Sequence, residues 1–358
     1  MAKEMTPQER MIALFKGEKP DRVPVNPFVL GYAAQILGIS IGDFYADGNN
    51  CFDAQFACMR LHGYDATPFY GYASCGPWEF GGRIEFPYKE GSSAPYVLQH
   101  PVNRIEDAER LEVPDFRKGL PGGYAESDKV LKRCREFGMP AIFQAGSVFT
   151  TASVVAETSL FLKWMFQEPK TVHLILEKIA ALFINALEYF AAQYGPENCL
   201  VFDGGPSEAN TVISPQKFKE FAFPYIEKVH TKIRDIGFAG VLMHPCADQN
   251  ANIPYYIELR EKLNWSGKYF WLFGPETPLE TQIKAFGSHD VICGNVDPPS
   301  FQTKSYGECL QLCKENIEHG KDSPGGFMLA PGCEFPPLAP PVSLMAMVDA
   351  AQMFGRYE

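Results

Sequence analysis

The sequence predicts a single (β/α)8 barrel, the TIM-barrel fold, over residues 1–358. Eight short apolar segments resemble strands, helical segments separate most of them, and no linker interrupts the alternation. An open, doubly wound sheet is the alternative, but the first strand–helix turn carries no Gly-x-Gly-x-x-Gly motif. The eight expected strands cover residues 23–26, 63–70, 140–146, 199–205, 238–244, 269–273, 290–295 and 326–330.

Capping signals and apolar periodicity predict the helices between these strands. Thr6-Pro-Gln-Glu9 is a capping-box pattern, which starts a helix that ends near Lys16 inside an N-terminal extension of residues 1–20. The segment 171–194 has apolar residues at helical spacing on one side. The other expected helices cover residues 31–37, 50–62, 105–111, 125–137, 154–166, 214–236, 255–263, 280–286, 306–319 and 342–354.

Residues 71–100 interrupt this alternation directly after the second expected strand. Glycine, proline and aromatic residues alternate there, around Arg83-Ile-Glu and Tyr96-Val-Leu-Gln. Two short extended segments joined by turn-forming residues indicate a hairpin insertion. We expect this insertion to act as a lid over one face of the barrel.

Composition and charge exclude several classes of protein. Hydrophobic residues make up 46% of the chain and charged residues 21%, which is typical of a folded domain, and the formal net charge is -11. This acidic balance argues against a nucleic-acid surface, and no apolar stretch reaches the ~20 residues of a membrane span. Because the N-terminus lacks an apolar signal segment, we expect a cytoplasmic protein whose ten cysteines form neither disulfides nor CxxC clusters.

The most informative residues are His244 and Cys246 after the fifth expected strand and Cys333 after the eighth. Residues two apart on a strand point to the same side, so His244 and Cys246 can reach one ion. The carboxyl ends of barrel strands meet at one mouth, which brings Cys333 to them. Two thiolates and one imidazole suit Zn²⁺, and three protein ligands leave a fourth position for substrate. The alternative is that each cysteine is a small buried apolar residue.

Three carboxylates are candidates for the fourth ligand or for acid–base work: Asp203, Glu276 and Glu334. Asp203 ranks first because it ends the fourth expected strand, and strand ends aim at the mouth. Its alternative role is to cap a neighbouring loop.

The motifs His244-Pro-Cys246, Gly294-Asn295-Val296 and Pro331-Gly-Cys333 together resemble the uroporphyrinogen decarboxylase superfamily. The likeness covers nearly the whole chain, and it is closest to the zinc-dependent corrinoid methyltransferases, which include methylcobamide:coenzyme M methyltransferases. Porphyrinogen decarboxylases are similar in fold but lack the thiolate pair and carry arginines near the first strand. No arginine occurs in residues 25–32, which disfavours that activity.

The resemblance implies one of two methyl transfers. In one branch, methyltransferase I, a methyl group moves from a methoxylated aromatic compound to the cob(I)alamin of a corrinoid protein. In the other, a methylated corrinoid donates to a thiol such as coenzyme M. The thiol branch usually continues Cys-Gly-Asn, whereas this chain has Cys246-Ala-Asp. This departure and the run Cys333-Glu-Phe-Pro favour O-demethylation.

The resemblance also implies a partner and a substrate site. Because the chain has no Asp-x-His-x-x-Gly motif for cobalamin, the corrinoid should arrive on another protein. A flat, apolar methyl donor would contact aromatic residues near the mouth, for which we name Phe28, Tyr32 and Tyr70, with Asn295 as a hydrogen-bonding group or a tie between loops. A barrel that only binds a ligand or protein, and a homo-oligomer, stay open alternatives.

Overall fold

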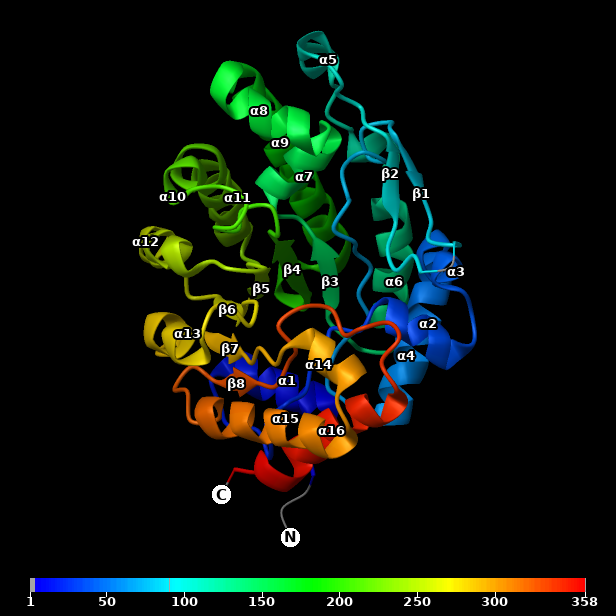
Figure 1. The fold of residues 1–358 in the computed structure, drawn as a ribbon, viewed down its shortest axis with the longest axis vertical. Coiled ribbons are helices and arrows are strands. Elements are labelled where there is room, and N and C mark those ends of the chain that lie inside the picture. The colour runs from blue at the N-terminus through cyan, green and yellow to red at the C-terminus, as the bar shows by residue number, and fades with distance from the viewer. Residues whose placement is uncertain (1–3, 90, 358) are drawn as a thin grey trace.

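Six parallel strands form the continuous part of the barrel wall. The computed structural model describes residues 4–89 and 91–357. The strands follow one another in chain order around the wall, which is the parallel α/β arrangement that the sequence predicts. They lie at the centre with helices outside them (Figure 1). Their bounds are β3 Ala141–Gln144, β4 Cys199–Gly204, β5 Gly240–His244, β6 Lys268–Leu272, β7 Val291–Cys293 and β8 Phe327–Met328.

The first two predicted strands complete the wall without forming regular strands. Val25 bridges Leu329 in parallel, and the Asn26 N–H donates to the Leu329 carbonyl at 2.9 Å. On the other side, the Asp65 N–H donates to the Val25 carbonyl at 2.8 Å. The prediction of a strand over 63–70 is wrong, since these residues carry no strand pairing of their own. Residues 23–26 nevertheless lie next to β8, and residues 64–70 lie next to residues 23–26, which is the order of neighbours in a barrel.

A seam separates residues 64–70 from β3. Within the described chain, no backbone hydrogen bond joins these two segments. Pro68 and Pro140 face this seam and have no N–H to donate to a ladder. The side chain of Gln55 instead binds the backbone of Phe69, donating to its carbonyl at 2.7 Å and accepting from its N–H at 3.1 Å. A glutamine amide thus replaces a neighbouring strand.

Helices cover the outside of the wall. The long helix α9 (Pro169–Tyr194) buries the apolar stripe that the sequence predicts, including Ile175, Ile179 and Phe183. The other helices are α1 Pro7–Lys16, α2 Gly31–Leu37, α3 Ile41–Ala46, α4 Gly48–His62, α5 Ile105–Arg110, α6 Gly123–Glu136, α7 Val148–Val155, α8 Thr158–Gln167, α10 Pro215–Lys217, α11 Phe223–Ile236, α12 Ile253–Leu263, α13 Leu279–Phe286, α14 Pro298–Thr303, α15 Tyr306–Gly320 and α16 Pro341–Phe354. None of the described helices is long and apolar enough to cross a membrane.

Two predicted helices are interrupted. The helix predicted over 154–166 is wrong as one element. Helix α7 ends at Val155, Ala156 is extended, and Glu157 caps the new helix α8, accepting from the Leu160 N–H at 2.9 Å. The helix predicted over 214–236 contains a π-helical turn at Phe218–Ala222 just before Pro224. Proline cannot donate to the preceding turn, and a wider turn accommodates it. Helices α3 and α14 were not predicted.

The insertion at 71–100 contains the predicted hairpin. Strands β1 (Arg83–Glu85) and β2 (Tyr96–Gln99) pair antiparallel. The hairpin returns to the body of the protein where the His100 Nδ1 contacts the Val154 carbonyl at 2.7 Å. Its role as a lid stays a prediction.

The N-terminal helix closes the barrel at the end opposite the mouth. Its predicted capping box is present, with Thr6 and Glu9 exchanging hydrogen bonds. The ring of Phe15 lies 4.8 Å from that of Phe270, whose side chain points into the barrel. Arg10 reaches Asp65 at 3.0 Å, and Arg22 binds the same carboxylate at 2.7 Å. This buried cluster joins α1 to the first two segments of the wall.

We expect the Asp65→Ala variant to lose about 3–5 kcal/mol of unfolding free energy, because it leaves two buried arginines without their shared carboxylate. Urea denaturation followed by far-UV circular dichroism measures this loss. Asp322→Ala is the matched control, since it breaks the exposed pair with Lys19 and should leave the midpoint almost unchanged. Equal midpoints for both variants would contradict the assigned importance of the cluster.

Candidate metal centre

Three potential metal ligands meet at the carboxyl ends of β5 and β8. His244 is the last residue of β5, Cys246 lies two residues further, and Cys333 follows β8. One ligand atom from each residue lies within 4.8 Å of the other two, and the two sulfurs are 3.8 Å apart. No other group of this kind is found among the described residues. The structure therefore brings together the three residues that the sequence singles out.

The imidazole of His244 is fixed by its second ring nitrogen. Nδ1 lies 2.7 Å from the carbonyl oxygen of Leu272 in β6. A carbonyl can only accept, so Nδ1 carries a proton, and Nε2 is the ring atom left to bind a metal once it has lost any proton of its own. Metal-binding histidines are commonly held in this way. The ring is 5% exposed, so the surrounding packing also restricts its rotation.

The two thiols share a hydrogen bond. This bond lowers the pKa of Cys246, and it raises the pKa of Cys333 to about 12. Burial is the largest single influence on His244 and lowers its pKa, but the hydrogen bond and charge of Cys333 and the hydrogen bond to the Leu272 carbonyl together leave the pKa raised. Without a bound metal, the Cys333 thiol therefore keeps its proton more tightly than the Cys246 thiol does.

The geometry of the thiols fits zinc. With Zn–S bonds of about 2.3 Å and a tetrahedral angle, two coordinated sulfurs lie roughly 3.8 Å apart. The distance of 3.8 Å between the sulfurs of Cys246 and Cys333 equals this value. Together with the Nε2 of His244, the two thiols can hold a zinc ion with one coordination position left over.

Close packing of three loops positions the thiols. A Cβ on Gly332 would lie 3.0 Å from the backbone nitrogen of Pro275, and one on Gly274 would lie 2.8 Å from that of Ala247. Ala247 itself has a φ of 59°, an uncommon conformation for a residue with a side chain. Such backbone outliers often occur at functional sites.

A buried amide holds the loop that carries Cys246. The Gln249 side chain donates to the Cys246 carbonyl at 3.0 Å and accepts from Asn252 at 2.7 Å. Its backbone N–H contacts the Thr277 hydroxyl of the next loop at 3.4 Å. These bonds keep the thiol in place without any metal.

Aromatic side chains form one wall of the site. The ring of Phe28 lies 5.5 Å from the His244 ring, and that of Phe202 lies 6.3 Å from it. Phe69 packs on Phe202 at 4.8 Å. Phe28 is half-buried and has a φ of 48°, so its backbone is strained at the point where it contacts the histidine. The predicted contact residue Phe28 therefore does lie at the site.

Phe202 is a site residue that the sequence reasoning missed. It shares a face of β4 with Leu200, whose side chain points into the barrel. Asp203 therefore points the other way and meets helix α11, where its carboxylate lies 2.8 Å from the His230 Nε2. The structure does not bring Asp203 to the thiols. Counting in steps of two from Leu200 along β4 would have placed Phe202 at the site and Asp203 on the outer face.

The other two carboxylates lie beside the ligand group, and neither belongs to it. Glu276 is exposed in the loop after β6, and its charge slightly opposes ionisation of Cys246. Glu334 accepts from the Gly31 N–H at 3.1 Å, and burial raises its pKa to about 8. Glu334 is thus the carboxyl group next to the thiols that most readily keeps its proton.

The remaining predicted contact residues have other partners. The Tyr32 hydroxyl lies 3.3 Å from His62, and its ring packs on Phe335, behind the loop that carries Cys333. The Tyr70 hydroxyl donates to the Tyr45 carbonyl at 2.8 Å, inside a separate cluster of tyrosines. Asn295 donates to the carbonyls of Gly274 and Thr277, so it ties two loops together, which was its alternative role.

The fold and the site define a barrel enzyme with a candidate metal centre at its mouth. The sequence model for uroporphyrinogen decarboxylase (URO-D) matches residues 6–354, and the chain belongs to this family. Uroporphyrinogen decarboxylases from Aeromonas salmonicida and Colwellia psychrerythraea are each 28% identical to it, over 204 and 202 residues. These matches cover 52% of this chain and 53% of each relative, so the chain spans about half the length of the relatives it matches.

A solved methyltransferase from Methanosarcina mazei has the same fold. The two structures superpose with a TM-score of 0.79 at 20% sequence identity, over 98% of this chain and 99% of the other. At this identity the likeness concerns the fold, and the function has to be argued from the site.

We expect His244→Ala, Cys246→Ser and Cys333→Ser each to lower bound zinc from about one equivalent to less than a tenth, because each removes one of three ligands. Metal analysis by mass spectrometry measures this, with the far-UV signal as a check on folding. The matched control is Cys309→Ser, because that buried thiol lies on α15, outside the ligand group, and donates to the carbonyls of Ser300 and Lys304. Zinc loss in Cys309→Ser as well would point to damaged folding.

A second variant tests the loop packing. Gly332→Ala should weaken zinc binding by about tenfold or more, since the added methyl group displaces the loop before Cys333. A competition titration against a chromophoric chelator gives the affinity. Gly307→Ala on α15 is the control, because nothing lies within 4 Å of its added Cβ. Unchanged affinity in Gly332→Ala would contradict the packing argument.

Proposed function

We propose that this protein is a zinc-dependent methyltransferase that moves a methyl group from a methoxylated aromatic compound to the cob(I)alamin of a corrinoid protein. The observation that carries the proposal is the pair of thiols and one imidazole at the barrel mouth, with zinc-compatible spacing. Structural zinc sites are usually closed by four protein ligands, whereas three ligands are typical of catalytic ones.

His244, Cys246 and Cys333 would hold the ion. A bound zinc ion supplies a Lewis acid next to the ether oxygen, where negative charge develops as the carbon–oxygen bond breaks. In the transfer itself, the methyl group would pass to the reduced cobalt of the partner, whose electron pair would form the new carbon–cobalt bond, and the electron pair of the broken carbon–oxygen bond would stay on the oxygen. The phenolate then takes a proton from water.

The residues of this chain would orient the donor. Phe28 and Phe202 offer aromatic faces beside His244, which suits a flat ring. Gln249 and the packed glycines keep the ligands rigid, so that little reorganisation is needed when substrate arrives. The mouth would also be where the corrinoid protein docks, and a reducing cytoplasm suits both the thiols and the reduced cobalt.

Porphyrinogen decarboxylation is less well supported, although the relatives named above carry that name. A substrate with several carboxylates calls for unpaired cations, and the two arginines nearest the first strand are already engaged. Arg10 binds Asp21 and Asp65, and Arg22 binds Asp65.

Transfer from a methylated corrinoid to a thiol is the second candidate. The same ligand set favours it, because a soft zinc site lowers the pKa of a thiol that it coordinates. The two candidates differ in the direction of transfer at the corrinoid, and one assay separates them.

The experiment mixes the zinc-loaded protein with cob(I)alamin, as a soluble stand-in for the partner, and methoxybenzene. We expect phenol and methylcobalamin, which is followed by its visible spectrum, to form at the same rate. The His244→Ala variant should form neither product. Phe28→Ala should raise KM for methoxybenzene about tenfold, since it removes an aromatic contact worth roughly 1.5 kcal/mol.

Two results would overturn the proposal. One is a zinc-loaded protein that leaves methoxybenzenes intact with every reduced corrinoid acceptor tested, while it methylates coenzyme M from methylcobalamin. The other is decarboxylation of a porphyrinogen by the metal-free protein.

A further inference from the structure

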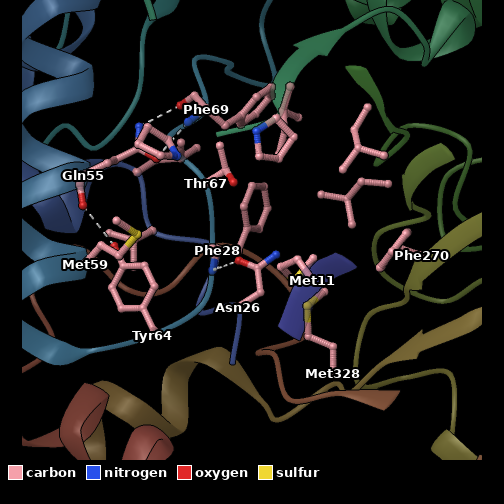
Figure 2. A pocket seen from close by; sticks show the side chains of 18 residues that line it. Met11, Asn26, Phe28, Gln55, Met59, Tyr64, Thr67, Phe69, Phe270 and Met328 are labelled. Atoms are coloured by element: carbon pink, nitrogen blue, oxygen red, sulfur yellow. Dashed lines mark hydrogen bonds between the residues drawn. The ribbon is translucent and has the colours of Figure 1, made fainter. Parts of the chain in front are cut away.

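A cavity lies inside the barrel, beneath the layer that contains His244. Its volume is about 50 Å³. Leu242 lines it and precedes His244 by two residues on the same face of β5, so it lies roughly 7 Å closer to the opposite end. Figure 2 shows that side chains from α1, from the first two wall segments and from β8 all reach this space, including Met11, Thr67 and Met328. Barrel interiors are normally filled by side chains, so an open chamber here is unusual.

The chamber is apolar and uncharged. Ile142, Leu200, Leu242, Phe270 and Met328 line it from the strands, and no charged residue is among its lining residues. Of the polar residues there, Gln55 is bound to Phe69 on both of its amide atoms, and the Asn26 Oδ1 accepts from the Phe28 N–H at 3.1 Å. Apolar cavities in proteins stay dry and bind small apolar molecules such as xenon or benzene.

A groove on the far end of the barrel leads to the chamber. This groove has a volume of about 630 Å³ and runs between α1 and the starts of β3 and β4. It shares Met11, Ala66, Thr67, Pro140 and Leu200 with the chamber. At most one layer of side chains therefore separates the chamber from solvent at this end.

The connection between the groove and the chamber follows from the seam in the barrel wall. Residues 64–70 and β3 stay apart because Pro68 and Pro140 donate no hydrogen bond, and Gln55 satisfies the backbone that the missing ladder leaves free. Thr67 and Ala66 are half-buried at this seam, where a paired strand would have covered them. The backbone beside the opening thus has its hydrogen bonds satisfied by the Gln55 side chain, and the seam can stay open.

We infer that the chamber is a binding site for one small, uncharged, apolar molecule, which enters from the end of the barrel opposite the metal centre through the seam. The size limits the ligand to about two or three non-hydrogen atoms, since a cavity of about 150 Å³ is needed for benzene. Phe28 and Phe69 line both the chamber and the aromatic wall of the metal centre. The inference does not rest on the proposed function, because the chamber can be occupied whatever reaction takes place above it. It gives the barrel two separate openings, one at the metal ligands and one at α1.

Xenon is the probe that tests the chamber. Crystals under xenon pressure should show one atom between Ile142, Leu200 and Leu242, and ¹²⁹Xe NMR should show saturable binding in solution. Leu200→Phe and Ile142→Phe each fill the space, and at least one that folds should lower xenon affinity tenfold or more. Leu61→Phe on the exposed face of α4 is the control, with unchanged affinity expected.

The entrance is tested separately. Ala66→Trp places a large ring at the seam and should slow xenon exchange tenfold or more while the affinity changes little. Exchange at the unmodified rate would overturn the assigned entrance. A chamber filled with ordered water, no xenon at this position, or equal affinity in a folded cavity-filling variant would overturn the binding site.

Discussion

The alternation of side chains along parallel strands decides which groups of this barrel can meet. His244 and Leu242 face inward on β5, and Phe202 and Leu200 do so on β4, while Asp203 faces helix α11. A shift of one residue in either strand would replace a candidate metal ligand or an aromatic wall residue with a residue that faces the outer helices. The candidate metal centre, its aromatic wall and the chamber beneath it all depend on this one register.

The ladders of β4, β5 and β6 set this register, and further contacts hold the side chains of the site in place. The Leu272 carbonyl fixes the tautomer of His244 from the neighbouring strand, and Gln249 holds the backbone of Cys246. Gly274 and Gly332 permit the loops after β5, β6 and β8 to touch, since any side chain there would meet backbone. The site is therefore prepared by residues that never contact a ligand, which is typical of rigid catalytic centres.

The sequence predicts the barrel and the three ligands because both depend on local signals. Apolar runs separated by capping motifs identify the elements, and a ligand at the end of such a run must lie at the mouth. It does not predict the seam, since residues 63–70 have the composition of a strand but find no partner at Pro140. The sequence also does not predict which aromatic residues reach the site. Tyr32 and Tyr70 instead bind His62 and Tyr45, which lie on helices whose position no local sequence pattern specifies.

The cluster of Arg10, Arg22 and Asp65 has a consequence for the order in which the chain folds. All three residues belong to the first 65 positions, so their contacts close short loops and can form while most of the chain is still unfolded or being synthesised. The junction of Val25 with Leu329 and the Gly31–Glu334 hydrogen bond, which spans 303 residues, can form only at the end. Cys333, one of the three candidate ligands, belongs to this last segment. Nascent chains would thus complete the metal centre in the same step that closes the barrel, and no partly made chain would hold the full ligand set.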